Sequence, residues 1–255
     1  MLVDTHCHIH EASHPLDVLD VIARAKLADV NQMICIGTNI DDSRIALEFA
    51  SHHNEIFASI GIHPHEASNN LDGLEGLLQL GNSSIVAVGE IGLDYHYDNC
   101  PHDIQMQALK NQIDLALKYN LPIIFHVREA FDDFWTIVDS YISAGKQIRG
   151  VLHSFTDTKQ NMQEAIKRGL YIGVNGYSTF VKDESQQAMF SMVPLERILI
   201  ETDAPFLTPA PFRGKVNEPA FVRNVAEYLA KSRHISFDEV ANATTTNARK
   251  LFNLK

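Results

Sequence analysis

Cysteine is scarce in this chain, and the spacing of the few cysteines excludes two kinds of site. The sequence holds three of them among 255 residues, namely Cys7, Cys35 and Cys100. An odd number without C-x-x-C spacing matches neither a disulfide framework nor a thiolate zinc site. We therefore expect three free thiols, and a metal site in this chain must use other ligands.

Long apolar runs are missing as well. No segment approaches the roughly 20 consecutive apolar residues that a membrane-spanning helix needs. The first residues, M-L-V-D-T-H-C-H, lack the basic start and the continuous apolar stretch of a secretory signal. These absences predict a cytoplasmic protein that has no membrane partner.

Positive charge is in the minority. The chain has 21 lysines and arginines against 32 aspartates and glutamates, which gives a net charge of −11. Non-specific binding of nucleic acid depends on many contacts from Lys and Arg to phosphates, so this net charge argues against a broad basic binding surface. If the substrate is a polyanion, local positive charge must hold it, and bound metal ions are the obvious source.

Nothing in the sequence marks a boundary between domains. There is no linker rich in Pro, Gly or Ser, no block of like charges and no low-complexity tract. The hydrophobic fraction of 45% and the charged fraction of 21% are those of an ordinary globular protein. Since α/β barrels of about this length form one domain, we predict a single domain over residues 1–255.

What the sequence does contain is a regular alternation of two patterns. Short β-branched, apolar runs predict buried strands at 2–3, 33–36, 56–62, 85–88, 121–127, 150–152, 171–174 and 198–200. Longer stretches with helical spacing lie between them, at 17–29, 43–51, 105–119, 130–143, 159–168 and 221–230. Strand followed by helix, about eight times over, is typical of a parallel sheet closed into a (β/α)8 TIM barrel. An open doubly wound sheet would show the same alternation.

Two histidines follow the first apolar run. His6 and His8 flank Cys7, and the period of two in a strand points both imidazoles to one side while Cys7 points away. Such a pair can bind one metal ion, although two nearby histidines are also common as polar residues at a strand end. The pair alone therefore does not distinguish a metal site from a polar strand end.

Four further polar side chains occupy similar positions. Glu90 follows V-A-V-G, His126 ends P-I-I-F, His153 ends G-V-L, and Asp203 follows I-L-I-E-T. Each alone is best explained as a hydrogen-bonded residue at a strand end, but a buried carboxylate such as Glu90 is costly unless cations pair with it. All six would converge on one mouth of a closed barrel and would be strung out along an open sheet, which favours the barrel.

Four imidazoles and two carboxylates exceed what one tetrahedral ion needs, so we predict two divalent metal ions. Glu90 is the natural bridging ligand because a carboxylate offers two oxygens. One plausible division places His6, His8 and Asp203 around the first ion, and His126 and His153 around the second. Asp203 could also take a proton from the attacking water, so Glu90 and Asp203 are the predicted catalytic residues.

Seven motifs give the chain a resemblance to a known family. They are D-T-H-C-H at 4–8, G-I-H-P-H at 61–65, V-G-E-I-G-L-D-Y at 88–95, F-H-V-R-E-A at 125–130, L-H-S-F at 152–155, E-T-D-A-P at 201–205 and R-G-K-V-N-E-P at 213–219. Over essentially the full chain they resemble the TatD-related hydrolases. The resemblance implies a TIM barrel, a divalent metal site with the same six ligands, and hydrolysis of phosphodiester bonds in DNA, often from a 3′ end.

Three more residues are candidates for substrate binding. Arg128 lies two positions after His126 and could pair with a phosphate, although a salt bridge to Glu129 or Asp132 is equally plausible. His63 repeats a His-x-His spacing after the third run, and it could lie beside the metal ligands or contact a phosphate. Arg213 lies on a Pro-rich loop after the eighth strand, which would bring positive charge to the barrel mouth.

The sequence thus predicts a monomeric, metal-dependent hydrolase acting on nucleic acid, with a 3′–5′ exodeoxyribonuclease as the leading interpretation. The attacking group would be a metal-activated water, and Mg, Mn or Zn are all possible ions. A deacylase for misacylated tRNA and an amidohydrolase-type enzyme cleaving C–N or ester bonds are the alternatives. Many amidohydrolases bridge their metals with a carboxylated lysine on strand four, whereas Glu90 fills that place here.

Overall fold

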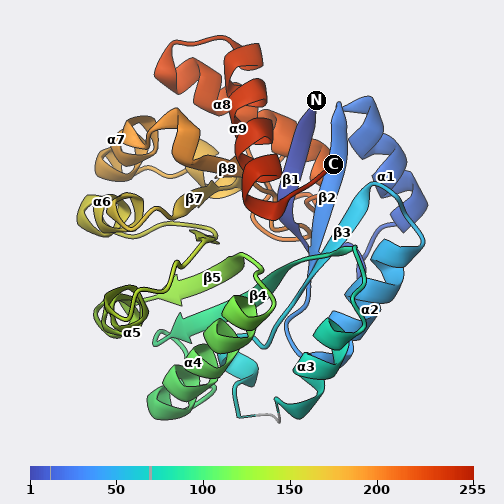
Figure 1. The fold of residues 1–255 in the computed structure, drawn as a ribbon. Coiled ribbons are helices and arrows are strands. Elements are labelled where there is room, and N and C mark those ends of the chain that lie inside the picture. The colour runs from blue at the N-terminus through green and yellow to red at the C-terminus, as the bar shows by residue number, and fades with distance from the viewer. Residues whose placement is uncertain (12, 69–70) are drawn as a thin grey trace.

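The computed structural model describes residues 1–11, 13–68 and 71–255, and its centre is a sheet of eight parallel strands in the order β1 to β8. Figure 1 shows the strands gathered in the middle of the molecule, with helices around them. The strands are β1 (Leu2–Cys7), β2 (Val30–Ile36), β3 (Ile56–Ile60), β4 (Ile85–Asp94), β5 (Ile123–Arg128), β6 (Gly150–Leu152), β7 (Tyr171–Val174) and β8 (Ile198–Ile200).

The first and last strands meet, and this contact closes the sheet. The backbone N–H of Asp203 donates to the carbonyl of His6 at 2.9 Å, and that of His8 donates to Ala204 at 2.8 Å. The buried Asp4 carboxylate accepts hydrogen bonds from the Thr202 backbone at 2.9 Å and from its hydroxyl at 2.6 Å. The prediction of a (β/α)8 barrel is therefore confirmed.

Three strands are longer than the predicted apolar runs, and β2 is one of them because it begins at Val30 and not at Met33. The sequence suggested that Glu90 follows the end of its strand. In the structure β4 continues from Ile85 to Asp94, so Glu90 lies inside the strand. The pairing with β5 shifts register between Val88 and Ile91 and then resumes. β1 likewise continues through His6 to Cys7. Polar residues interrupt the apolar pattern at these places. The backbone hydrogen bonds between strands do not require apolar side chains, so the strands continue past the apolar runs.

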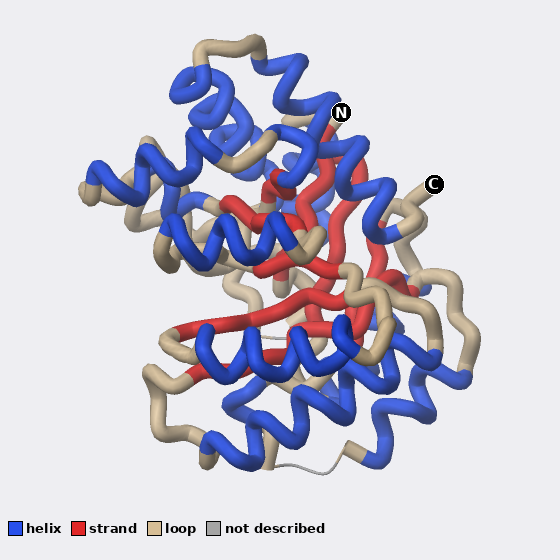
Figure 2. Tube along the Cα trace, turned by 60° about the vertical axis from the view of Figure 1, so that its left-hand side comes forward, coloured by secondary structure: helices blue, strands red, loops and turns tan. Residues whose placement is uncertain are grey.

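The helices lie outside the strands, as Figure 2 shows. Each has buried apolar residues on one face. In α1, for example, the Asp17 carboxylate caps the first turn, and Val21, Ile22 and Ala25 form the buried face. The helices are α1 (Val18–Leu27), α2 (Ile40–Ser51), α3 (Asp72–Gln79), α4 (His102–Lys118), α5 (Phe131–Ser143), α6 (Lys159–Lys167), α7 (Glu184–Met192), α8 (Val222–Arg233) and α9 (Phe237–Phe252).

The amino-terminal half of the barrel interior is apolar and is covered by α9. Every strand contributes at least one side chain to a cluster that includes Val3, Ile124 and Leu199, which places this cluster inside the barrel. Leu251 and Phe252 of α9 join the same cluster and are 5% and 2% exposed. α9 also packs against β1 and β8 (Figure 1). The open end of the barrel is therefore the one at the carboxyl ends of the strands.

In the part of the chain that the structure describes, none of the helices combines the length and apolar character needed to cross a membrane.

Candidate metal centre

The barrel places the predicted ligands at one end. His6 lies near the end of β1 and His8 just after it, Glu90 and His126 lie in β4 and β5, and His153 and Asp203 follow β6 and β8. Because all strands are parallel, their carboxyl ends share one rim. Residues up to 197 positions apart in the sequence therefore meet in one cluster.

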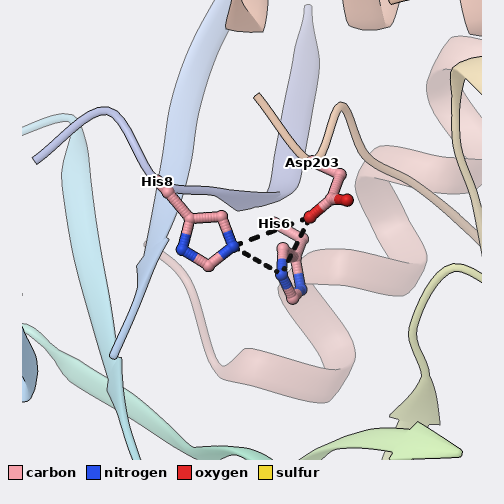
Figure 3. Close-up of side chains that lie close together, drawn as sticks. All are labelled: His6, His8 and Asp203. Atoms are coloured by element: carbon pink, nitrogen blue, oxygen red, sulfur yellow. Dashed lines mark hydrogen bonds and ion pairs between the residues drawn. The ribbon is translucent and has the colours of Figure 1, made fainter. Parts of the chain in front are cut away.

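His6, His8 and Asp203 form the first group of close ligand atoms (Figure 3). The Nε2 atoms of His6 and His8 are 3.3 Å apart, and they lie 3.4 Å and 3.6 Å from Asp203 Oδ1. Ligand atoms at about 2.0–2.1 Å from a tetrahedral zinc ion are about 3.3–3.4 Å apart. The three atoms thus have separations close to those of ligands that share one ion.

The backbone at Asp203 aims its carboxylate into this group. Asp203 has φ +60°, in the left-handed region that a residue with a side chain seldom adopts. Its N–H is held by the carbonyl of His6 at 2.9 Å. A non-glycine residue in this region costs of order 1 kcal/mol, and such strain is typical of functional positions.

Glu90 lies at the centre of the cluster. Its Oε2 is 3.5 Å from His6 Nε2, and its Oε1 is 3.1 Å from His153 Nε2 and 2.8 Å from His126 Nδ1. Burial alone would raise the pKa of this carboxyl, but the imidazoles of His153, His6 and His126 hold it well below its usual range. Glu90 therefore stays ionised although it is buried, and each of its oxygens faces different imidazoles.

His126 contacts a second carboxylate as well. Its Nε2 lies 3.0 Å from Asp94 Oδ2, and the same oxygen is 3.0 Å from His65 Nε2. Burial lowers the pKa of His126, but the contacts with Asp94 and Glu90 outweigh this effect and raise it. His126 therefore lies between Glu90 and Asp94, and Asp94 orients its ring from the side away from Glu90.

His63, predicted to bind substrate, lies against the same cluster. Its Nε2 is 3.8 Å from Glu90 Oε1, and His63, Glu90 and His126 form another group of close ligand atoms. Burial lowers the pKa of His63 to about 3, so the ring is neutral. The structure thus brings His63 to the predicted metal ligands, which is one of the two positions that the sequence left open for it.

His153 is the last of the predicted ligands in the cluster, and it contacts both Glu90 and His6. Its ring stacks on that of His6 with centroids 3.8 Å apart, and its Nδ1 lies 3.2 Å from Glu201 Oε1. That separation suits an ion pair, but it lacks hydrogen-bond geometry. Glu201 is fixed by the Ser154 N–H at 2.6 Å, and a Cβ on Gly173 would lie 2.6 Å from its carboxylate. Glycine at 173 therefore leaves the space that Glu201 needs.

The cluster has the composition of a metal centre. The ligand atoms of His6, Glu90 and His153 form a further close group, so His6 and Glu90 each belong to two groups. Within residues 1–11, 13–68 and 71–255, every ion pair of Glu90, Asp94 and Asp203 is with an imidazole, and none is with Lys or Arg. Buried carboxylates need cations, and converging imidazoles favour a divalent metal.

A cavity of about 650 Å³ opens above these residues. His126, His153 and Asp203 lie on its floor. Its walls include residues that the sequence analysis did not single out, among them Tyr97, Tyr177 and Phe206, of which Tyr97 and Phe206 are 46% and 58% exposed. Nothing in the sequence marks these aromatic residues, because exposure on a loop is a tertiary property.

The two predicted arginines lie in different places. Arg128 lines the cavity, and its guanidinium is 5.0 Å from the centre of the Tyr97 ring. Its neighbour Glu129 pairs with His96 at 2.6 Å instead of with Arg128. Arg213 donates to the Thr208 carbonyl at 3.0 Å and lies 3.7 Å from the ring of Phe180, and it is not among the residues that line the cavity. Of the two, only Arg128 lines this cavity.

Comparison with known proteins agrees with this geometry. Residues 3–253 match the family model for TatD related DNase. The chain is 39% identical to the uncharacterized metal-dependent hydrolase YabD of Bacillus subtilis, over 100% of both chains. It is 35% identical to the 3′-5′ ssDNA/RNA exonuclease TatD of Citrobacter rodentium, over 92% of this chain and 91% of that one.

A solved structure supports the same relationship. The TatD homologue YJJV of Escherichia coli superposes with a TM-score of 0.92 at 29% sequence identity, covering 100% of this chain and 98% of the other. The chain therefore belongs to the TatD-related DNase family and is a metal-dependent hydrolase.

Proposed function

We propose that this enzyme hydrolyses phosphodiester bonds in single-stranded DNA and removes nucleotides from the 3′ end. The observation that carries the proposal is a cavity with metal-ligating residues on its floor and an arginine and aromatic rings on its walls. The related protein of Citrobacter rodentium is named for this chemistry.

The described residues can hold two divalent ions. His6, His8 and Asp203 would hold one ion, while His126 and His153 would hold the other, with Glu90 between them. His63, at 3.8 Å from Glu90, is a further candidate for the second ion. Mg, Mn and Zn are the candidate ions, and when bound they would lower the pKa of a water molecule and offset negative charge on the phosphate.

Asp203 is the proposed general base. Burial raises the pKa of Asp203, but the hydrogen bond with His8 and the nearby rings of His153 and His6 lower it by more than burial raises it. The net pKa is below the usual value, so the carboxylate is ionised at neutral pH. Its side chain keeps 17% of its surface exposed and lines the cavity, whereas Glu90 keeps only 5%. Asp203 can thus accept a proton from a water in the cavity, while Glu90 serves as a ligand.

The walls of the cavity suit a single strand. Aromatic rings on a cavity wall bind nucleobases by stacking without regard to sequence, and the exposed Tyr97 and Phe206 and the half-buried Tyr177 supply three rings. Arg128 can pair with a backbone phosphate through its guanidinium. These groups lie together on a protein of net charge −11, so binding depends on the cavity and not on the overall surface.

A substrate panel tests the proposal. Protein loaded in turn with Mg, Mn or Zn would be assayed on single-stranded DNA, double-stranded DNA, RNA, misacylated tRNA and cyclic amides. We expect mononucleotide release from the 3′ end of single-stranded DNA, and 3′-phosphorothioate ends should block it. Asp203→Asn, with Asp238→Asn at an exposed position of α9 as the control, assigns the activity to this site. Turnover of only the misacylated tRNA or only the cyclic amides would refute the phosphodiesterase assignment.

A further inference from the structure

A second cavity lies at the opposite end of the barrel from the metal centre. It has a volume of about 270 Å³, and it lies where β6, β7 and β8 begin and where α9 ends. Arg149 precedes β6, Tyr171 is the first residue of β7, Arg197 precedes β8, and Lys250 is in the last turn of α9. Segments far apart in the sequence thus build one site, as they do at the other end.

Three cations on this cavity have no carboxylate partner in the part of the chain that the structure describes. The Arg149 Nη2 atom donates to the Asn120 carbonyl at 2.6 Å and to its side-chain oxygen at 3.0 Å. The Arg197 Nη1 atom donates to the Gly169 carbonyl at 2.8 Å. Each guanidinium is therefore held in place by neutral oxygens and keeps other donors for a ligand. Lys250 is exposed at the rim.

The fourth cation on the cavity, Arg168, differs from the other three because it has carboxylate partners. Arg168 also lines the cavity, but it pairs with Asp139 through two bonds of 2.6 and 2.7 Å and with Glu164. The chain has more acidic than basic residues. The lack of a carboxylate partner for Arg149, Arg197 and Lys250 within the described residues is therefore not due to a shortage of carboxylates. Like charges that gather in a concave site without counter-charges repel each other, and an anion in the cavity would relieve that repulsion.

The rest of the lining suits a small organic anion. The Tyr171 ring is 5% exposed and has the Arg197 guanidinium 5.3 Å from its centre, and Ile148 and Leu251 add apolar surface. A volume of about 270 Å³ is near the lower end of the range for small-molecule sites, roughly 300 Å³. The cavity is therefore larger than a bare phosphate needs.

We propose that this cavity binds the phosphate group of a small phosphate monoester, of the size of a mononucleotide or a sugar phosphate. Arg149, Arg197 and Lys250 would contact the phosphate, and the Tyr171 side would contact the organic part. The proposal is independent of the substrate of the metal centre, because the two cavities share no lining residue.

Calorimetric titration tests this site. The probes are 5′-AMP, ribose 5-phosphate and orthophosphate, titrated into the purified protein and into the double variant R197Q/K250Q. We expect both esters to bind more tightly than orthophosphate, and the dissociation constants of the esters to rise at least about tenfold in the double variant. Lys110→Gln, which removes one exposed charge on α4, is the matched control and should change them less than about twofold.

Two further variants separate this site from the metal centre. Asp203→Asn should leave ester binding at the second cavity unchanged, and R197Q/K250Q should leave hydrolytic activity unchanged. The sole tryptophan, Trp135, has the Arg168 guanidinium 4.5 Å from the centre of its ring, so its fluorescence offers a second readout of binding. Absence of binding up to ~10 mM, or ester binding that persists undiminished in a folded R197Q/K250Q protein, would overturn the proposal.

Discussion

The two halves of the barrel interior are built from the same strands but carry opposite kinds of side chain. At the amino end, side chains such as Val3, Ile124 and Leu199 fill the interior, and α9 covers them. At the carboxyl end, imidazoles and carboxylates occupy the corresponding space, and a cavity of about 650 Å³ lies above them. Apolar packing at the amino end stabilises the fold. Burial of charged groups at the carboxyl end costs free energy, and the apolar packing must offset that cost.

This division explains why the site can be polar without unfolding the protein. Glu90 is 4% exposed in a strand whose earlier residues, Val86 and Val88, are fully apolar. The same strand therefore contributes to the core over its first residues and to the metal centre over its later ones. Stability and chemistry should respond separately to changes at the two ends, and the following predictions test that separation.

The largest effect is expected at the centre of the ligand cluster. Glu90→Gln keeps the shape of the side chain but removes the charge that faces His6, His126 and His153. We expect hydrolytic activity to fall by more than about 10⁴-fold, or roughly 5.5 kcal/mol in the barrier, because the metal centre loses its shared ligand. Steady-state rates and elemental analysis of the purified variant measure the loss.

The control for this variant is Glu48→Gln, which removes a carboxylate from the exposed surface of α2. It should retain full activity and metal content. A Glu90→Gln enzyme with normal metal content and normal turnover would show that Glu90 is not a ligand. The assignment of the metal-binding chemistry to the carboxyl end of the barrel would then be wrong at its central residue.

A substitution at the amino end should have the converse result. Phe252→Ala removes a side chain that is 2% exposed where α9 covers the barrel. We expect the free energy of unfolding to fall by about 3–5 kcal/mol, because a large cavity is left in the apolar cluster. Urea denaturation measures the change. Activity per folded molecule should stay within about twofold, and a selective loss of activity in folded protein would contradict the separation.

Much of the fold follows from the sequence because strands and helices carry local signals. All eight apolar runs are strands of the barrel, since a parallel strand buried on both faces needs a continuous apolar run. α9 was not among the predicted helices. Its role as a cover depends on Leu251 and Phe252 meeting strands from the whole chain, and no local pattern encodes that contact.

The candidate site follows from the sequence only in part. His6, His8, His153 and Asp203 were identified because each stands where an apolar run ends, and a parallel barrel brings such positions together. The approach of His63 to Glu90 was only one of two alternatives, since it depends on the path of the loop after β3. That these residues bind metal stays a prediction, although the structure brings them together.

Metal removal probes the carboxyl end as a whole. An ion that binds only the folded protein stabilises it by mass action, by about 2.7 kcal/mol at a concentration of 100 times the dissociation constant. We expect a chelator to lower the melting temperature of the wild-type protein and to have little effect on Glu90→Gln. Scanning calorimetry with and without each candidate ion measures both. Equal shifts in the two proteins would place the stabilising ion somewhere else.

The smallest effect is expected at the wall of the cavity, where the two predicted arginines can be compared. Arg128→Gln removes a cation that lines the cavity and lies over the Tyr97 ring, so we expect KM for single-stranded DNA to rise about tenfold, with kcat less affected. Arg213→Gln removes a guanidinium that lies on Phe180 outside that lining, and KM should change less than about threefold. Steady-state kinetics at low and moderate salt measure both variants. If Arg213→Gln had the larger effect, the bound strand would have to reach the loop after β8, and the substrate-contacting surface would extend well beyond the cavity over the metal centre.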